Sequence, residues 1–174
     1  MTQFIGNGEI NARRAQLVIT GNSINIPSTF TTVNATNFTN LTFTPELTNL
    51  INYDENTGAI TVLEQGFLSM FATLNVQADH ASAELQLIPE FNSGSGWVPG
   101  LGRKSVLTAI KPSQVEWNGV KKMQRNEQIC FCIAAIDGNI AFKTEYLDPG
   151  GPNECLVPAA VLYLHLSKEF ESIL

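Results

Sequence analysis

The chain has 174 residues, a length typical of one domain, and its ten basic and sixteen acidic residues give a net charge of −6. This balance lacks the basic footprint that nucleic-acid binding needs, and it disfavours binding to an anionic membrane surface. Charged residues make up only 15% of the chain, and the 16 asparagines and 15 threonines favour turns and strands over helices.

Residues 1–40 are polar and rich in Asn and Thr, with short apolar patches such as Leu17–Ile19. They are either an extended N-terminal arm that precedes a compact domain over residues 41–174 or a first pair of edge strands. The start of the chain, Met1–Glu9, has neither the charged segment nor the apolar segment of a secretory signal. We therefore expect synthesis in a reducing cytoplasm.

Short runs of alternating apolar and polar residues recur along the chain, and no window of a dozen residues has a clear helical period. The predicted strands are Leu17–Thr20, Leu41–Phe43, Ala59–Leu63, Phe67–Val76, Ala83–Ile88, Val106–Ile110, Ile129–Ile136, Asn139–Tyr146 and Val157–Leu166. Turn residues separate them, and Asp137-Gly138 predicts a hairpin. Many short strands joined by such turns are typical of a β-sandwich or a barrel.

Two of these strands carry more apolar residues than one sandwich face can use. In Phe67–Val76 the even positions are all apolar, yet the opposite face carries Phe67 and Phe71, about 13 Å apart by strand geometry. The run Ile129–Ile136 is apolar on both faces, although a sandwich strand has only one core to face. We expect another subunit to cover the second face; the alternative is cover by the N-terminal arm or a loop.

The segment from Asn52 to Leu68 combines several short motifs in a fixed order. They are Tyr53-Asp54, the turn Thr57-Gly58, the pair Ile60-Thr61 and Gly66-Phe67 at the start of a long strand. This order resembles the signature of C1q/TNF-like jelly-roll domains, and Gln124–Ile136 and Val157–Leu166 resemble two later strands of that family. The family's Pro after the Thr is absent here, and its Gly-Asp pair is replaced by Asn126-Glu127.

The resemblance implies an all-β jelly-roll sandwich of the C1q/TNF type that trimerises about a threefold axis. A trimer supplies the partner that the surplus apolar surface needs. We predict a trimer interface that contains Phe67, Phe71 and Ile133, from one face of each of the two strands singled out above.

Jelly rolls of this kind are also similar to small accessory virion proteins of tailed bacteriophages. This similarity implies a non-enzymatic virion structural protein, made in the host cytoplasm, and first of all a capsid decoration protein bound to the major capsid protein. One alternative is the receptor-binding tip of a tail fibre or spike, bound to a tail protein. Another is a C1q/TNF-like ligand or carbohydrate-binding module in which Trp97 and Trp117 stack on sugars.

No catalytic, cofactor-binding or metal site is predicted. Ser95 lacks the Gly-x-Ser-x-Gly spacing and the following helix of a hydrolase nucleophile, and Arg103 stands where a phosphate loop needs Gly. Trp97 lies on a long glycine-rich loop, either as a possible partner contact or as a plug for one end of the sandwich.

The three cysteines do not form a recognisable disulfide framework. Cys130 and Cys132 share one face of a predicted strand, and a zinc site would require Cys155 and His165 to converge on them. We interpret the cysteines instead as small buried side chains.

Overall fold

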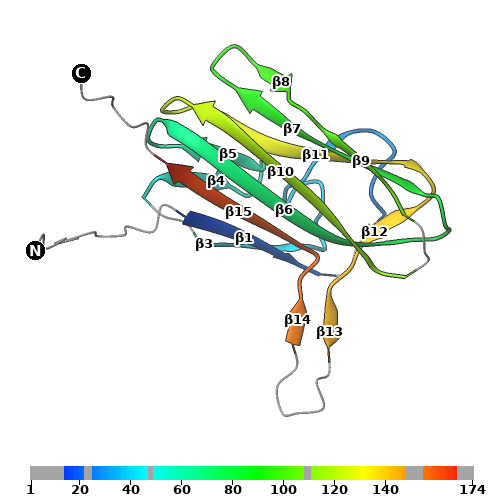
Figure 1. Ribbon diagram of the computed structural model, residues 1–174. Helices are drawn as coiled ribbons and strands as arrows, with labels where there is room; N and C mark the ends of the chain where they lie inside the picture. Colours follow the sequence, from blue (N-terminus) through cyan, green and yellow to red (C-terminus); the bar gives the residue numbers. More distant parts are fainter. Residues whose placement is uncertain (1–13, 22–24, 47–48, 108–110, 148–154, 168–174) are drawn as a thin grey trace, which may run out of the picture.

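The computed structural model describes residues 14–21, 25–46, 49–107, 111–147 and 155–167. Their regular structure is entirely β-strand, in two antiparallel sheets that pack face to face, and a small third sheet projects from one end (Figure 1). The predicted all-β sandwich is therefore confirmed. Within the described part of the chain, no helix has the length and apolar character to cross a membrane.

The first sheet has the strand order β10-β6-β15-β1-β3, and β12 also pairs with β6. Its strands are β1 (Arg14–Thr20), β3 (Thr42–Glu46), β6 (Gly66–Ala78), β10 (Ser113–Met123), β12 (Ile140–Phe142) and β15 (Ala160–Ser167). The long strand β6 pairs with β10 along one edge and with β15 along the other. The first and last strands of the sandwich, β1 and β15, lie side by side.

The second sheet has the order β4-β5-β11-β7-β8, with β2 beside β11 and β9 beside β7. Its strands are β2 (Thr31–Thr32), β4 (Ile51–Asp54), β5 (Ala59–Val62), β7 (Glu84–Asn92), β8 (Trp97–Pro99), β9 (Arg103–Val106) and β11 (Gln128–Asp137). The third sheet is the pair β13 (Glu145–Leu147) and β14 (Cys155–Val157), which extends away from the body in Figure 1.

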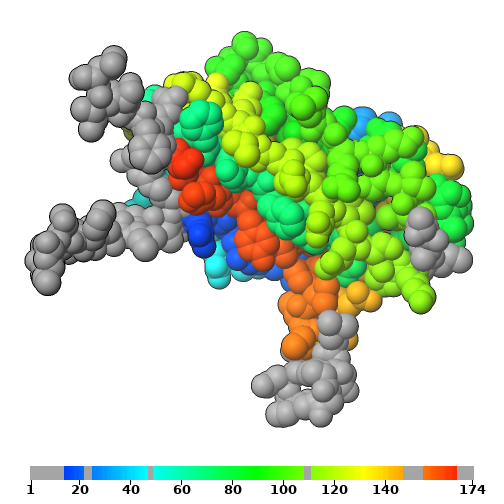
Figure 2. Space-filling model, viewed as in Figure 1, coloured from blue at the N-terminus to red at the C-terminus, as the bar shows by residue number. Residues whose placement is uncertain are grey.

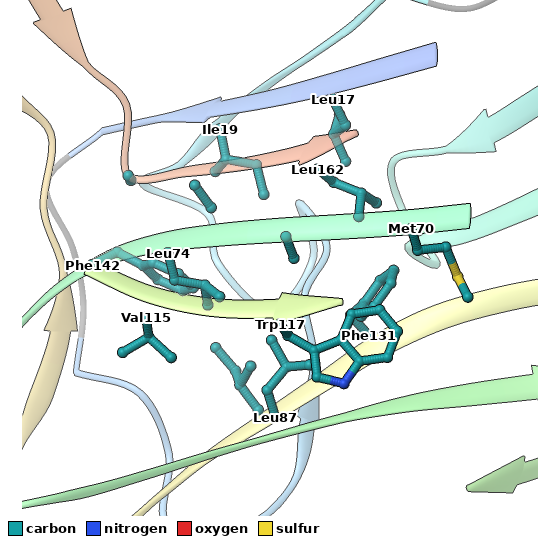
Figure 3. Close-up of a cluster of buried hydrophobic side chains, with 14 of the residues drawn as sticks. Leu17, Ile19, Met70, Leu74, Leu87, Val115, Trp117, Phe131, Phe142 and Leu162 are labelled. Atoms are coloured by element: carbon teal, nitrogen blue, oxygen red, sulfur yellow. The ribbon is translucent and has the colours of Figure 1, made fainter. Parts of the chain in front are cut away.

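Buried side chains from the facing sides of the two large sheets form one hydrophobic core (Figure 3). Trp117 of β10 packs edge-on against Phe131 of β11, with ring centroids 5.3 Å apart. Gly119 makes room for the indole, because a Cβ at that position would lie 2.6 Å from the Trp117 ring. The core occupies the inner faces, so any further contact must use the outer faces, the loops or the projecting hairpin.

The described part of residues 1–40 belongs to the sandwich and is not an extended arm. Strand β1 lies between β15 and β3, and β2 pairs with β11. The alternating residues Ala15, Leu17 and Ile19 are buried in the core, which explains why this segment joins the sheet despite its polar neighbours. Residues 1–13 and 22–24 lie outside the described residues.

The predicted hairpin at Asp137-Gly138 is wrong. Gly138 adopts a φ of +83°, the left-handed conformation that glycine favours in turns, but β11 before it and β12 after it belong to different sheets. The chain crosses the edge of the sandwich at this turn. The turn at Thr57-Gly58, by contrast, joins the paired strands β4 and β5 as the resemblance implied.

Candidate functional site

The outer face of the six-stranded sheet carries large apolar side chains. Phe67 is 40% exposed and Tyr163 is 47% exposed. The half-buried Phe71 lies directly opposite Tyr163 in the register of β6 and β15, with ring centroids 6.4 Å apart. Val161 and Val18 pair across β15 and β1 and continue this surface. We call these five residues the aromatic face.

Figure 2 shows this side of the molecule, with β15 in red-orange between β6 in teal and β1 in blue. A groove of about 760 Å³ lies on it. Its lining combines the rings of Phe71 and Tyr163 with the side chains of Arg14, Glu46 and His165. Aromatic rings with polar side chains around them are typical of surfaces that bind proteins.

The structure brings together two of the three predicted interface residues. Phe67 and Phe71 share the aromatic face, where the sequence prediction missed Tyr163. The prediction for Ile133 is wrong, because its side chain has 0% exposure and belongs to the core. Strand β11, which carries Ile133, also lies in the other sheet, so one flat contact cannot contain both predicted faces.

Strand β11 is buried on both faces within a single chain. Ile129, Phe131 and Ile133 face the core, whereas Cys130 and Cys132 are buried outside the core cluster, on the outer face of the seven-stranded sheet. Their neighbours in the register are the longer side chains of β7. A second subunit is therefore not needed to cover this strand, contrary to the sequence expectation.

The two buried cysteines lie beside two oxygen-bearing side chains. The Sγ of Cys130 lies 4.0 Å from Oε2 of Glu90, and the Sγ of Cys132 lies 3.5 Å from Oγ1 of Thr32. The hydrogen bond with Cys132 is the largest cause, and burial the second, of a pKa of Cys130 that lies above its ordinary range. This thiol therefore holds its proton tightly when no cation is nearby.

The other two residues considered for a zinc site lie elsewhere. Cys155 is exposed on β14 of the projecting hairpin, and His165 is exposed on the outer face of the six-stranded sheet. The four residues Cys130, Cys132, Cys155 and His165 therefore do not converge.

Strand β8 begins with an exposed tryptophan, directly after the short loop that follows β7. Trp97 is 41% exposed, and Val98 and Leu101 nearby are 59% and 91% exposed. The backbone N–H groups of Gly94 and Gly96 both donate to Oδ1 of Asn92, which closes the loop. Trp97 is thus a surface residue, and its role as a partner contact stays a prediction.

Trp117 is only 6% exposed, and its indole N–H donates to the carbonyl oxygen of Leu101. The predicted stacking of Trp117 on a sugar is therefore wrong. Ser95 lies in the loop closed by Asn92, and Arg103 begins strand β9. The loop thus leads into a strand and lacks the helix that a phosphate loop would need.

No protein-family model and no curated protein matches the chain. Solved structures do resemble it. The globular domain of zebrafish complement 1qA protein has 12% identity and a TM-score of 0.55, covering 87% of this chain and 95% of that one. Eiger TNF from S. frugiperda has 9% identity and a TM-score of 0.56, covering 92% and 96%. Murine APRIL at pH 8.5 has 12% identity and a TM-score of 0.50, covering 88% and 99%.

These likenesses extend over most of each chain, whereas the identities are too low to carry more than architecture. The protein therefore has the jelly-roll fold of C1q and TNF domains, and the predicted fold is confirmed.

Proposed function

We propose that the protein is a non-enzymatic, homotrimeric structural or binding module whose aromatic face lies at the threefold contact. The observation that carries this proposal is the exposure of Phe67 and Tyr163 on the middle strands of a sheet. Phe71 is the ring neighbour of Tyr163, and Phe67 lies four residues away along β6 on the same face. A soluble monomer rarely leaves several large apolar side chains exposed on one face, and such patches are typical of interaction sites. A threefold contact brings three copies of the same patch together.

The magnitudes indicate how much the rings contribute. Full burial of a large apolar side chain contributes roughly 1.5–3 kcal/mol. Phe67 and Tyr163 are 40% and 47% exposed, so burying the remainder contributes about 1 kcal/mol each, or about 6 kcal/mol over three chains. Association costs about 4–15 kcal/mol, so Val18, Val161 and the polar groups of the groove must add to the rings.

The charged rim of the groove suits the same contact. Arg14 of β1 and Glu46 of the neighbouring β3 line the groove. His165 of β15 lies opposite Arg14 in the register of β15 and β1. Opposite charges on neighbouring chains would favour one relative orientation of the subunits. The charged rim would thus set the relative orientation of the subunits, and the rings would contribute the buried apolar surface.

The oligomeric state is tested by light scattering coupled to size-exclusion chromatography. We expect a mass of three chains for the parent protein and dissociation for Phe71→Asp, because three desolvated carboxylates would lie close together. Val106→Asp is the matched control, since Val106 is 53% exposed on β9 of the other sheet. A monomeric parent, or a Phe71→Asp protein that stays trimeric, contradicts the proposal.

Within this proposal, we assign the trimer to a bacteriophage virion, as a capsid decoration protein that binds the major capsid protein after synthesis in the host cytoplasm. The compact jelly roll and the acidic, Asn- and Thr-rich composition support this role. Mass spectrometry and cryo-electron microscopy of purified particles test it. Many copies at capsid threefold positions support decoration, a few copies at the tail support a tail-fibre or spike tip, and absence from particles contradicts both.

A second candidate is a C1q/TNF-like ligand or carbohydrate-binding module. The fold likeness to a complement protein and to a TNF supports it at least as well. The exposed Trp97 offers an aromatic ring on which a sugar ring can stack. Specific binding on a glycan array that is lost in Trp97→Ala would support this candidate, and Val106→Ala serves as its control.

A further inference from the structure

A compact cluster of sulfur and oxygen atoms lies on the outer face of the seven-stranded sheet, away from the aromatic face. Three neighbouring strands supply it. Cys130 and Cys132 come from β11, Glu90 lies opposite Cys130 on β7, and Thr32 lies opposite Cys132 on β2. The sheet register, which the backbone hydrogen bonds fix, therefore sets the positions of all four side chains.

The spacing of these atoms is close to that around a tetrahedral metal ion. One ligand atom from each of Glu90, Cys130 and Cys132 lies within 4.8 Å of the others. Tetrahedral Zn²⁺, with bonds of about 2.3 Å to sulfur and 2.1 Å to oxygen, places two sulfurs about 3.8 Å apart and a sulfur and an oxygen about 3.6 Å apart. The observed 4.0 Å from Cys130 Sγ to Glu90 Oε2 exceeds this value by a few tenths of an ångström.

We propose that Glu90, Cys130 and Cys132 bind a single thiophilic divalent cation, with Zn²⁺ as the best fit. Two thiolates and one carboxylate are ligands that zinc accepts, whereas Ca²⁺ and Mg²⁺ take oxygen ligands almost exclusively. Three protein ligands leave one tetrahedral position open. Oγ1 of Thr32 lies 3.5 Å from Cys132 Sγ, so this hydroxyl would fill the open position or hold a water there.

The surroundings of the cluster suit an enclosed ion. Cys130 and Cys132 are 3% and 4% exposed, and the adjacent Ala134 is 0% exposed, so the sulfurs are shielded from water. Glu90 is only half-buried, which leaves a path by which an ion can enter. Because neither sulfur belongs to the hydrophobic core cluster, packing of the core does not require thiols at these positions.

A bound ion would have a defined mechanical effect. Its ligands lie on the adjacent strands β7 and β11, so coordination adds a cross-link between them beyond the backbone hydrogen bonds. On binding, the two thiol protons leave to solvent, and the +2 charge of the ion offsets most of the negative charge of two thiolates and one carboxylate. The folded chain alone presents the three ligands at this spacing, so the ion stabilises the folded state.

The test uses the full chain, purified under reducing conditions, stripped with a chelator and titrated with Co²⁺ and then Zn²⁺. We expect one Co²⁺ per chain, with thiolate-to-cobalt charge-transfer absorption in the near ultraviolet that Zn²⁺ abolishes by displacing the Co²⁺. Cys130→Ser and Cys132→Ser should each weaken Co²⁺ binding at least about tenfold and reduce that absorption. Glu90→Gln should weaken binding while the absorption at saturation remains.

Cys155→Ser is the matched control, because Cys155 is exposed on the separate hairpin. It should bind Co²⁺ like the parent protein. Absent thiolate absorption in the parent, absorption that survives in both Cys130→Ser and Cys132→Ser, or its loss in Cys155→Ser overturns the proposal. If the serine variants fail to fold, Cys155→Ser still decides: it must show the absorption, and Zn²⁺ must raise its melting temperature, and failure of either overturns the proposal.

Discussion

The two outer faces of the sandwich both carry apolar residues that a solvent face does not need, but they differ in how those residues are covered. On the six-stranded sheet, Phe67 and Tyr163 remain 40% and 47% exposed. On the seven-stranded sheet, Cys130, Cys132 and Ala134 are 3%, 4% and 0% exposed. The large rings on the first face therefore lack a cover within the chain, whereas these central β11 side chains on the second face are already covered.

Side-chain size explains the difference. A Phe or Tyr ring stands above its neighbours on a pleated sheet, and only another surface can bury it. A Cys or Ala side chain lies between the longer side chains of the adjacent strand, such as Glu90 and Ile88, which lie opposite Cys130 and Cys132. A strand that is apolar on both faces thus indicates a subunit contact only when the second face carries large residues.

The largest effect on stability is expected in the core and not on either outer face. Ile133→Ala should lower the free energy of unfolding by about 2–5 kcal/mol, because it removes a side chain with 0% exposure and leaves a cavity. Urea titration measures this loss, and Val106→Ala, on an exposed position, is the control. An Ile133→Ala protein that is as stable as the parent but has a different oligomeric state would show that Ile133 lies in the interface.

The next effect concerns the aromatic face alone. Tyr163→Ala removes a ring that contributes about 1 kcal/mol in each of three chains, so it should raise the trimer dissociation constant on the order of 100-fold. Sedimentation equilibrium over a dilution series measures the constant. Val120→Ala, at a 68% exposed position on the edge strand β10, should change it much less. Equal effects of the two substitutions would show that the contact is not centred on β6 and β15.

A smaller effect tests whether the other outer face is closed within one chain. Ala134→Leu places a larger side chain where the exposed fraction is 0%, and we expect it to lower the free energy of unfolding by about 1–3 kcal/mol without changing the oligomeric state. Val120→Leu, on an exposed position, should leave stability unchanged. An Ala134→Leu variant with an unchanged free energy of unfolding would mean that there is free space above Ala134 on this face.

Most strands could be predicted from the sequence because their alternation is regular. One long strand, β10, was missed for a local reason. In β10, Val115 and Trp117 alternate with polar residues, but Gly119 and the charged residues after it interrupt the pattern. Gly119 stands there because the Trp117 ring occupies the space of a Cβ. The contact that explains the glycine is visible only in three dimensions.

The candidate site could be predicted in part for a related reason. Alternation in β6 identified Phe67 and Phe71 as an outward apolar pair, which the structure confirms as partly exposed. Alternation cannot assign a strand to a sheet, so Ile133 was placed on the same contact although β11 lies in the other sheet. The cysteine cluster likewise needed the register between β7 and β11, which brings Glu90 to Cys130.

The smallest effect concerns the polar edge of the seven-stranded face. Lys104 on β9 forms an ion pair with Glu84 on β7. Hydrogen bonding from Lys104, and then from Gln86, lowers the pKa of the Glu84 carboxyl from its ordinary value of 4.5. The folded chain therefore holds this proton less tightly than the unfolded chain does, so the pair stabilises the fold above about pH 4.5 and this contribution disappears as the pH falls through the lowered pKa.

Glu84→Gln should accordingly lower the melting temperature slightly at pH 7, and the difference from the parent should vanish at about pH 2. If this face stays in water while the aromatic face is covered, added salt should also reduce the difference, because salt screens exposed ion pairs. Glu116→Gln, on the exposed side of β10, is the control in the same buffers. A difference that is independent of salt but disappears in acid would place the Glu84–Lys104 pair inside a contact, and the assignment of the two outer faces would have to be exchanged.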